Sequence, residues 1–464
     1  MMKAPRWMCL LTALLALGGG SGCPGEPIPC INGAPAQRQG PSVFGVGTEA
    51  VFTVGADLTR ACDEPNSVRH PESVTVEVKD PENQPVPATA TLTGNGTTAT
   101  IRFTPTVKGR HHVIVAFAPV GSLHQLSIFA GEDRRQEPAL TTLPTGTPCL
   151  YLGRTTRGTW VCDAQARRGP DGAPQALGTT PGSGPTAVAG DVVWTVDGER
   201  VLRYVDTGTG PLQLTGTAPY PRDSTSAGSF SQGPHARLAT PDELVVLGDA
   251  FLHRYTFTEA AGVDAAPTTG WVPEEAPLAF GGDLARGLLV RAGARLLVVT
   301  RTSDPRTFEP RTFACPYRPG NSGDYRPVQG EACHTLVGEP VGYEEGVVWT
   351  HTFISSGPTP VSLLRRYTAT SGRLQEEGAF TLDGQFILNR PSLRPGPALP
   401  FLTPLSSSAP FVGPRWDATR GLLELELLPE HLGASAPQLG EHFLWMTGSF
   451  NGTGIRVYPR QSTR

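Results

Sequence analysis

The tetrapeptide Val-Val-Trp-Thr occurs at residues 192–195 and again at residues 347–350. Each copy is followed by a second strand-like stretch that contains leucine and ends in tyrosine, at residues 201–204 and 364–367. Short stretches rich in valine, leucine and aromatic residues are typical of strands, and two in succession indicate a hairpin. The chain therefore contains a repeated β-hairpin.

Similar hairpins recur between these two copies and after them. Their strand pairs are residues 244–247 with 252–255, 288–290 with 296–299, and 443–445 with 455–458. The first four hairpins begin 52, 44 and 59 residues apart, at Val192, Leu244, Leu288 and Val347. Hairpin units that repeat every ~40–50 residues are typical of a β-propeller. The 316 residues from Cys149 to Arg464 are thus predicted to form an irregular six- or seven-bladed β-propeller, with a jelly roll or a second sandwich as the alternative.

The composition favours an all-β chain. Of 464 residues, 55 are Gly and 46 are Pro, and only 17% of the residues are charged. Such a composition suits short strands and many turns better than long amphipathic helices. The formal net charge is only −4, and basic residues do not cluster, which excludes nucleic-acid binding through a basic surface as the main role.

The N-terminus has the features of an export signal. Lys3 and Arg6 precede an apolar run from Trp7 to Leu17, which is too short for a permanent membrane span but suits a signal peptide. The following Gly20-Ser21-Gly22-Cys23 resembles the lipobox of bacterial lipoproteins. The resemblance implies a signal peptide over residues 1–22, lipidation of Cys23, palmitate among its acyl chains, and membrane anchoring through the lipid. The alternative is an ordinary secretory peptide that is cleaved nearby.

Pro24 stands where an aspartate commonly signals inner-membrane retention, which favours the outer membrane of the cell envelope. Residues 23–40 are rich in Pro, Gly and small residues and are expected to form a tether.

Residues 41–130 have a different rhythm. Short β-type runs at 51–54, 74–78, 98–103 and 113–117 alternate with turn sequences, which predicts an antiparallel sandwich. The motifs Val76-Glu77-Val78-Lys79-Asp80-Pro81, Gly94-Asn95-Gly96-Thr97 and Phe103-Thr104-Pro105-Thr106 resemble those of a filamin-type immunoglobulin repeat. The resemblance implies an immunoglobulin-like module that binds protein or acts as a spacer and carries no catalytic residues. Residues 131–148 are expected to link this module to the propeller-like domain at 149–464.

Six of the eight cysteines remain once Cys9 and Cys23 are set aside. An even number in an exported protein favours disulfides, although six cysteines allow 15 connectivities. Neighbours along the chain give the pairs Cys30–Cys62, Cys149–Cys162 and Cys315–Cys333. The alternative is that some of the six are free and buried.

Motifs for enzyme chemistry are lacking in the sequence. No P-loop and no His-Glu-x-x-His zinc motif occurs, and we predict no catalytic residue, cofactor or metal site. His111 and His112 would point to opposite faces of a strand, and surface histidines are expected there. Glu424 and Glu426 are expected on the solvated face of a strand, with a carboxylate pair for acid–base chemistry as the alternative.

The tryptophans at equivalent hairpin positions, Trp194, Trp349 and Trp445, are expected to pack between blades, with a carbohydrate platform as the alternative. Recognition is expected in loops that break the repeat. The segment from Arg301 to Pro340 carries the candidate binding residues Tyr317, Arg318, Tyr325 and Arg326, because Tyr and Arg are enriched at binding hot spots.

These observations predict a cell-envelope lipoprotein that acts as a non-enzymatic binding or scaffold protein. Its partner would be an unknown envelope protein or glycan. The alternatives are a propeller enzyme such as a glycan lyase or hydrolase, and a structural component of an envelope machine.

Overall fold

The computed structural model of the chain describes residues 38–56, 71–93, 96–118, 122–144, 149, 151–178, 186–197, 200–220, 236–247, 251–266, 269–270, 288–303, 310–344, 346–354, 361–370, 372–383, 386–389, 401–404, 411–429, 438–439, 442–449 and 453–460. Regular structure in these ranges consists of strands β1 to β39, without a helix, which confirms the predicted all-β class. It follows that these ranges hold no helix with the length and apolar character needed to cross a membrane. The predicted signal peptide, Cys23, Cys30, Cys62 and most of the predicted tether lie outside the described residues.

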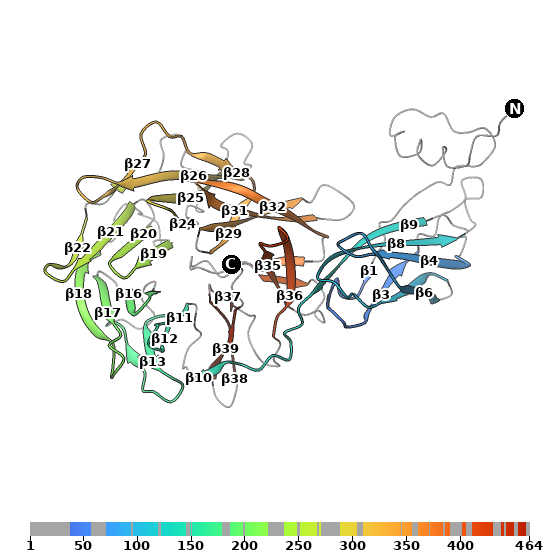
Figure 1. Ribbon diagram of the computed structural model, residues 1–464, viewed down its shortest axis with the longest axis horizontal. Coiled ribbons are helices and arrows are strands. Elements are labelled where there is room, and N and C mark those ends of the chain that lie inside the picture. Colours follow the sequence, from blue (N-terminus) through green and yellow to red (C-terminus); the bar gives the residue numbers. More distant parts are fainter. Residues whose placement is uncertain are drawn as a thin grey trace.

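The N-terminal part is a two-sheet sandwich (Figure 1). The first sheet has the order β1 (Arg38–Gln39), β3 (Ala50–Gly55), β7 (Thr98–Phe103) and β6 (Ala88–Thr93). The second has the order β2 (Val43–Gly45), β9 (Ser122–Gly131), β8 (Gly109–Ala118), β4 (Ser73–Lys79) and β5 (Pro85–Val86). Alternate residues of β3 and β8, including Phe52, Val54, Val113 and Val115, are buried in a shared core, as the period of a strand requires. We call this part the sandwich.

Seven further sheets form a ring, the arrangement of a β-propeller, and we number them as blades in chain order (Figure 1). Blade one consists of β11 (Leu152–Arg154), β12 (Thr159–Cys162), β13 (Gln165–Arg168) and β14 (Gln175–Ala176). Blade two consists of β15 (Thr186–Ala189), β16 (Val192–Asp197), β17 (Arg200–Val205) and β18 (Gln213–Pro219). Blade three consists of β19 (Ala236–Thr240), β20 (Glu243–Leu247), β21 (Phe251–Thr258), β22 (Gly262–Ala265) and β23 (Thr269–Gly270).

Blades four to six continue the same antiparallel pattern. Blade four consists of β24 (Leu288–Ala292), β25 (Arg295–Ser303), β26 (Pro310–Pro319), β27 (Tyr325–Pro327) and β28 (His334–Leu336). Blade five consists of β29 (Glu339–Glu344), β30 (Val347–Ile354), β31 (Val361–Thr370) and β32 (Arg373–Asp383). Blade six consists of β33 (Phe386–Asn389), β34 (Phe401–Pro404), β35 (Val412–Asp417) and β36 (Leu422–Leu427).

Blade seven closes the ring because it draws its strands from both ends of the propeller sequence. It has the order β10 (Thr141–Pro144), β39 (Thr453–Pro459), β38 (Phe443–Ser449) and β37 (Gln438–Leu439). Leu143 of β10 pairs with Ile455 of β39. The segment expected to be a linker, residues 131–148, therefore supplies a strand to the last blade.

Each junction between neighbouring blades contains hydrophobic residues from both sides. Strand β16 is buried along its whole length. Its Val193 packs with residues of blade one, and its Trp194 packs with residues of blade three. A strand that faces a neighbour on both sides is apolar along most of its length, without alternation, which is why the Val-Val-Trp-Thr repeat is visible in the sequence.

Trp194, Trp349 and Trp445 are all buried, with exposed fractions of 0%, 2% and 2%. They pack between blades, as expected, so none of the three presents an open ring face on the surface as a carbohydrate platform would. Two disulfides are present, Cys149–Cys162 in blade one and Cys315–Cys333 in blade four. Both pairs were predicted from their order along the chain.

Candidate binding site at the sandwich–propeller junction

The sandwich lies beside blade six (Figure 1), and backbone hydrogen bonds join the two. The chain leaves β9 and runs parallel to β36, where Asp133 forms a bridge with Leu427. The Leu427 N–H donates to Glu132 O at 2.9 Å, and the Arg134 N–H donates to Leu427 O at 3.0 Å. Strand β36 is the edge strand of blade six, so this segment covers an edge that would otherwise be open to pairing.

Apolar residues of both domains share one core at this junction. Val43 and Phe129 of the sandwich belong to the same buried cluster as Leu425 and Leu427 of blade six. An interface of this kind resembles a continuous core more than a contact between two free domains, so it fixes their relative position.

Two groups of ion pairs complete the junction. The Arg134 guanidinium, which is buried, lies 3.4 Å from the Glu426 carboxylate and 2.5 Å from that of Glu137. Burial raises the pKa of Glu426 despite the nearby charge of Arg134. The Glu132 carboxylate lies 3.1 Å from both the Lys108 ammonium and the Arg415 guanidinium.

At Glu132 the neighbouring cations outweigh burial in setting the pKa, the opposite of the outcome at Glu426. Burial alone would raise the pKa, but the hydrogen bond and charge of Lys108, together with the charges of Arg415 and Arg134, lower it. Glu132 therefore stays ionised between a cation of the sandwich and a cation of the propeller.

A cavity of about 270 Å³ lies beside this junction. One side is formed by the turn before β8 and by β8 itself, and the others by β30, β31, β32 and the β35–β36 hairpin. Its lining contains two tryptophans, four cations, one carboxylate and a histidine: Trp349, Trp416, Lys108, Arg110, Arg366, Arg420, Glu424 and His112. We call it the junction cavity.

Most of the cations in the junction cavity are held by neighbouring groups. Arg366 donates to Thr368 Oγ1 at 3.0 Å, forms an ion pair with Glu377, and lies over the Trp416 ring at 4.9 Å from its centroid. Arg420 pairs with Glu424 at 3.2 Å. Arg110 donates to Ser127 Oγ, a neutral acceptor, at 2.8 Å. These contacts orient the cations before any ligand arrives.

The three equivalent tryptophans differ in one respect. The Trp194 Nε1–H donates to Thr240 O, and the Trp445 Nε1–H donates to Cys149 O, both at 2.9 Å. Trp349 lines the junction cavity, and its buried Nε1 has no hydrogen-bond partner within the described part of the chain. An unpaired buried donor is costly, and the pattern in the sequence gave no sign of this difference.

The candidate binding residues of blade four are not gathered on a surface. Tyr317 and Tyr325 are 2% and 3% exposed and pack in the core between blades three and four. Tyr325 donates its hydroxyl hydrogen to Glu243 Oε1 at 3.1 Å. Only Arg318 and Arg326 are exposed. The expectation that all four residues form a binding surface is therefore wrong for the tyrosines, because β26 and β27 are strands of a blade and not a free loop.

The histidine and glutamate pairs also need correction. His112 is exposed and lines the junction cavity, but His111 is fully buried in the sandwich, 5.8 Å from the Phe103 ring. Glu424 and Glu426 are 6% and 5% exposed, because the sandwich and the segment after β9 cover the face expected to be solvated. Both carboxylates are engaged with arginines.

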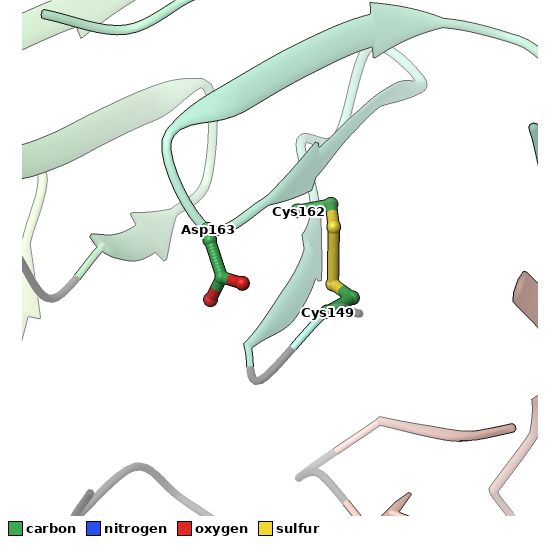
Figure 2. A group of neighbouring side chains, drawn as sticks. All are labelled: Cys149, Cys162 and Asp163. Carbon is green, nitrogen blue, oxygen red and sulfur yellow. A yellow bond between two sulfur atoms is a disulfide. The ribbon is translucent and has the colours of Figure 1, made fainter. Parts of the chain in front are cut away.

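One group of possible metal ligands occurs among the described residues, namely Cys149, Cys162 and Asp163, whose ligand atoms lie within 4.8 Å of one another. Figure 2 shows that the two sulfur atoms are bonded to each other and that Asp163 lies beside them. Sulfur atoms in a disulfide are not thiolates, the form that binds metal. Asp163 Oδ1 accepts a hydrogen bond from the Tyr151 N–H at 2.9 Å, so this carboxylate has a structural partner.

No protein-family model and no curated protein sequence matches the chain. Solved structures similar to it include the filamin domain of Lin-41, with 17% identity over 22% of this chain and 95% of that chain, and a TM-score of 0.17. A protein from Lactobacillus plantarum is 15% identical over 70% of this chain and 94% of that chain, with a TM-score of 0.37. A quinonprotein alcohol dehydrogenase-like protein from Bacteroides thetaiotaomicron is 11% identical over 90% of this chain and 91% of that chain, with a TM-score of 0.34. These similarities concern the fold alone.

Proposed function

We propose that the protein is a lipoprotein of the bacterial cell envelope that binds a partner without transforming it, with the sandwich and the propeller acting as one rigid body. Lipidation at Cys23 anchors it, and the tether spaces it from the membrane, ending where β1 joins the sandwich at Arg38. The two domains together present the binding surface. The lipobox-like Gly20-Ser21-Gly22-Cys23 supports the anchor.

The single observation that carries the binding role is the shared junction. A spacer module needs no fixed position, yet here backbone hydrogen bonds, a common apolar core and buried ion pairs all tie the sandwich to blade six. Fixing two domains lowers the entropy that is lost when a partner contacts both of them. Glu424, the carboxylate in the cavity lining, and Glu426 of the same strand are paired with arginines, which suits charge balance better than acid–base chemistry.

The anchor is tested by growing cells with a labelled fatty acid. We expect the label in the wild-type protein and its loss in Cys23→Ala, with that variant released from the membrane fraction. Labelling that persists in Cys23→Ala would contradict the proposal.

The binding role is tested by cross-linking in intact envelopes, with wild type compared with a junction variant such as Gly131→Arg. We expect the cross-linked partners to depend on an intact junction, while both proteins reach the envelope at equal levels. Turnover of envelope glycans by the purified protein would contradict a non-enzymatic role.

A further inference from the structure

We propose that the junction cavity binds a small ligand, of about monosaccharide size, through a carboxylate group. This inference deepens the proposed binding role, and it rests on the cavity and not on the lipid anchor. Its strongest support is the unpaired donor of Trp349, because this residue lines the cavity while being 98% buried.

The first step concerns the missing acceptor. At the two equivalent positions the protein itself supplies a carbonyl oxygen to the indole N–H, at Thr240 and at Cys149. Among the described residues no such oxygen reaches Trp349 Nε1. Native structures leave few buried donors unsatisfied, and an exception calls for a ligand or a role. Because the Nε1 atom itself is buried, a ligand oxygen in the junction cavity would complete the pattern after a local shift of the surrounding side chains.

The second step concerns charge. Four cations line the cavity. Lys108, Arg366 and Arg420 are each paired with a carboxylate, whereas Arg110 has a neutral hydroxyl as its partner. Burial, followed by the charges of Arg110 and Lys79, lowers the pKa of His112, which agrees with a positive potential on this side. An anion is therefore favoured over a neutral ligand or a cation.

The third step selects a carboxylate. Planar guanidinium groups match the geometry of a carboxylate, and a single negative charge tolerates the nearby Glu424 better than the double charge of a phosphate does. Glu424 also offers acceptor oxygens for the hydroxyl groups of a sugar. A volume of about 270 Å³ is at the small end of the range for ligand pockets, which limits the ligand to about monosaccharide size.

The test uses the purified full-length chain and isothermal titration calorimetry with glucuronate, glucose and inorganic phosphate. We expect glucuronate to bind, glucose to bind at least tenfold more weakly, and added sodium chloride to weaken the glucuronate affinity. Tighter binding of phosphate than of glucuronate, or no binding of any probe, would overturn the inference. If cross-linked envelope partners were retained in either case, the proposed function would stand without it.

Trp349→Phe removes the unpaired donor, and Trp194→Phe is its matched control. We expect Trp349→Phe to weaken glucuronate binding by about 10- to 100-fold, whereas Trp194→Phe leaves the affinity within about twofold. In the absence of ligand, we expect the opposite order for the melting temperature. Trp194→Phe should lower the melting temperature more, because it deprives Thr240 O of its donor, while Trp349→Phe removes a donor that has no partner. Unchanged affinity in Trp349→Phe, or equal losses of melting temperature, would overturn the assignment.

Discussion

Gly131 of the sandwich lies directly against the carbonyl oxygen of Leu425 in blade six. An ideal Cβ atom on Gly131 would come within 1.6 Å of that oxygen, and no L-residue with a side chain fits at that distance. The two backbones meet where β9 ends and where β36 carries its buried glutamates. Close approach of two backbones is a standard reason for glycine, and here it sets how near the sandwich lies to the propeller.

Gly131→Ala is predicted to loosen this junction. Neither backbone can rotate away as a side chain would, so the domains must separate or β36 must shift, at a cost of about 1–3 kcal/mol. The hydrogen bonds of the Leu427 and Arg134 N–H groups should open more often. Hydrogen–deuterium exchange should show these two amides exchanging about tenfold faster or more.

Gly454→Ala is the matched control, since the nearest atom to its added Cβ would be Leu143 O at 3.4 Å, an ordinary contact. Equal exchange rates in Gly131→Ala and the wild type would show that the junction does not depend on this close approach.

The Arg134–Glu426 pair should matter for stability chiefly because each residue neutralises the buried charge of the other, and less because of the attraction between them. Removing one partner of a buried pair leaves the other uncompensated and costs about 3–5 kcal/mol. We therefore expect Arg134→Met to lower the free energy of unfolding by about this amount, as measured by urea denaturation. The double variant Arg134→Met/Glu426→Gln should recover a large part of the loss, because no buried charge then remains without a partner.

The same pair predicts a pH dependence. Because the folded-state pKa of Glu426 is raised, the folded protein binds a proton more readily than the unfolded chain, and this group favours folding as the pH falls. Removing the charge of Arg134 strengthens that effect. Arg134→Met should therefore lose less stability, relative to the wild type, at pH 5 than at pH 8. A loss that is independent of pH would contradict a charged Glu426 as its cause.

His111 should make the sandwich sensitive to acid. Burial lowers the pKa of His111 more than the Gly109 carbonyl and the charge of Asp80 raise it, so the ring is neutral in the folded protein. Below a pH of about 6.5 the unfolded chain binds a proton that the folded chain does not, and stability falls by up to about 1.4 kcal/mol per pH unit.

Urea denaturation between pH 7 and pH 5 measures this loss. It should shrink most in His111→Phe. His112→Gln changes the exposed neighbour, whose pKa is also lowered, and should reduce the loss less because that ring is less buried. If both variants kept the full loss, other groups would be responsible for the acid sensitivity.

The propeller could be predicted from the sequence because its second strands are buried on both faces. Val192, Val193 and Trp194 are apolar without alternation for that reason, and a pattern of this kind repeats visibly. Strand β10 could not be predicted in the same way. It has only four residues, Thr141–Pro144, and its partner β39 lies more than 300 residues away along the chain.

The junction between the sandwich and the propeller could not be predicted from the sequence, for a related reason. In Leu422–Leu427 the alternation of leucine and glutamate is typical of a strand with a solvated face. However, β8 and β9 contact this strand, and Arg134, from the segment after β9, pairs with Glu426 on that face. A cover that comes from a distant part of the chain leaves no local mark on the strand it covers. The exposure of the tyrosines of blade four could not be predicted either. Their residue type favours binding surfaces, but strand pairing with β25 and β27 places Tyr317 in the core.

The Cys149–Cys162 disulfide is predicted to stabilise the point where the propeller ring closes. Cys149 packs with residues of both blade seven and blade one, and its carbonyl accepts the hydrogen bond of Trp445. The bridge closes a loop with a sequence separation of 13, for which the chain-entropy model gives about 3 kcal/mol. We expect Cys149→Ala/Cys162→Ala to lose about that much stability and to become insensitive to reduction at this position.

Cys315→Ala/Cys333→Ala, which removes the bridge within blade four, serves as the comparison. Both double variants should melt at lower temperature. Because only Cys149–Cys162 lies at the closure, only its loss should speed amide exchange in β10 and β39 ahead of the other blades. Exchange that rises equally in all blades would show that the ring closes independently of this disulfide.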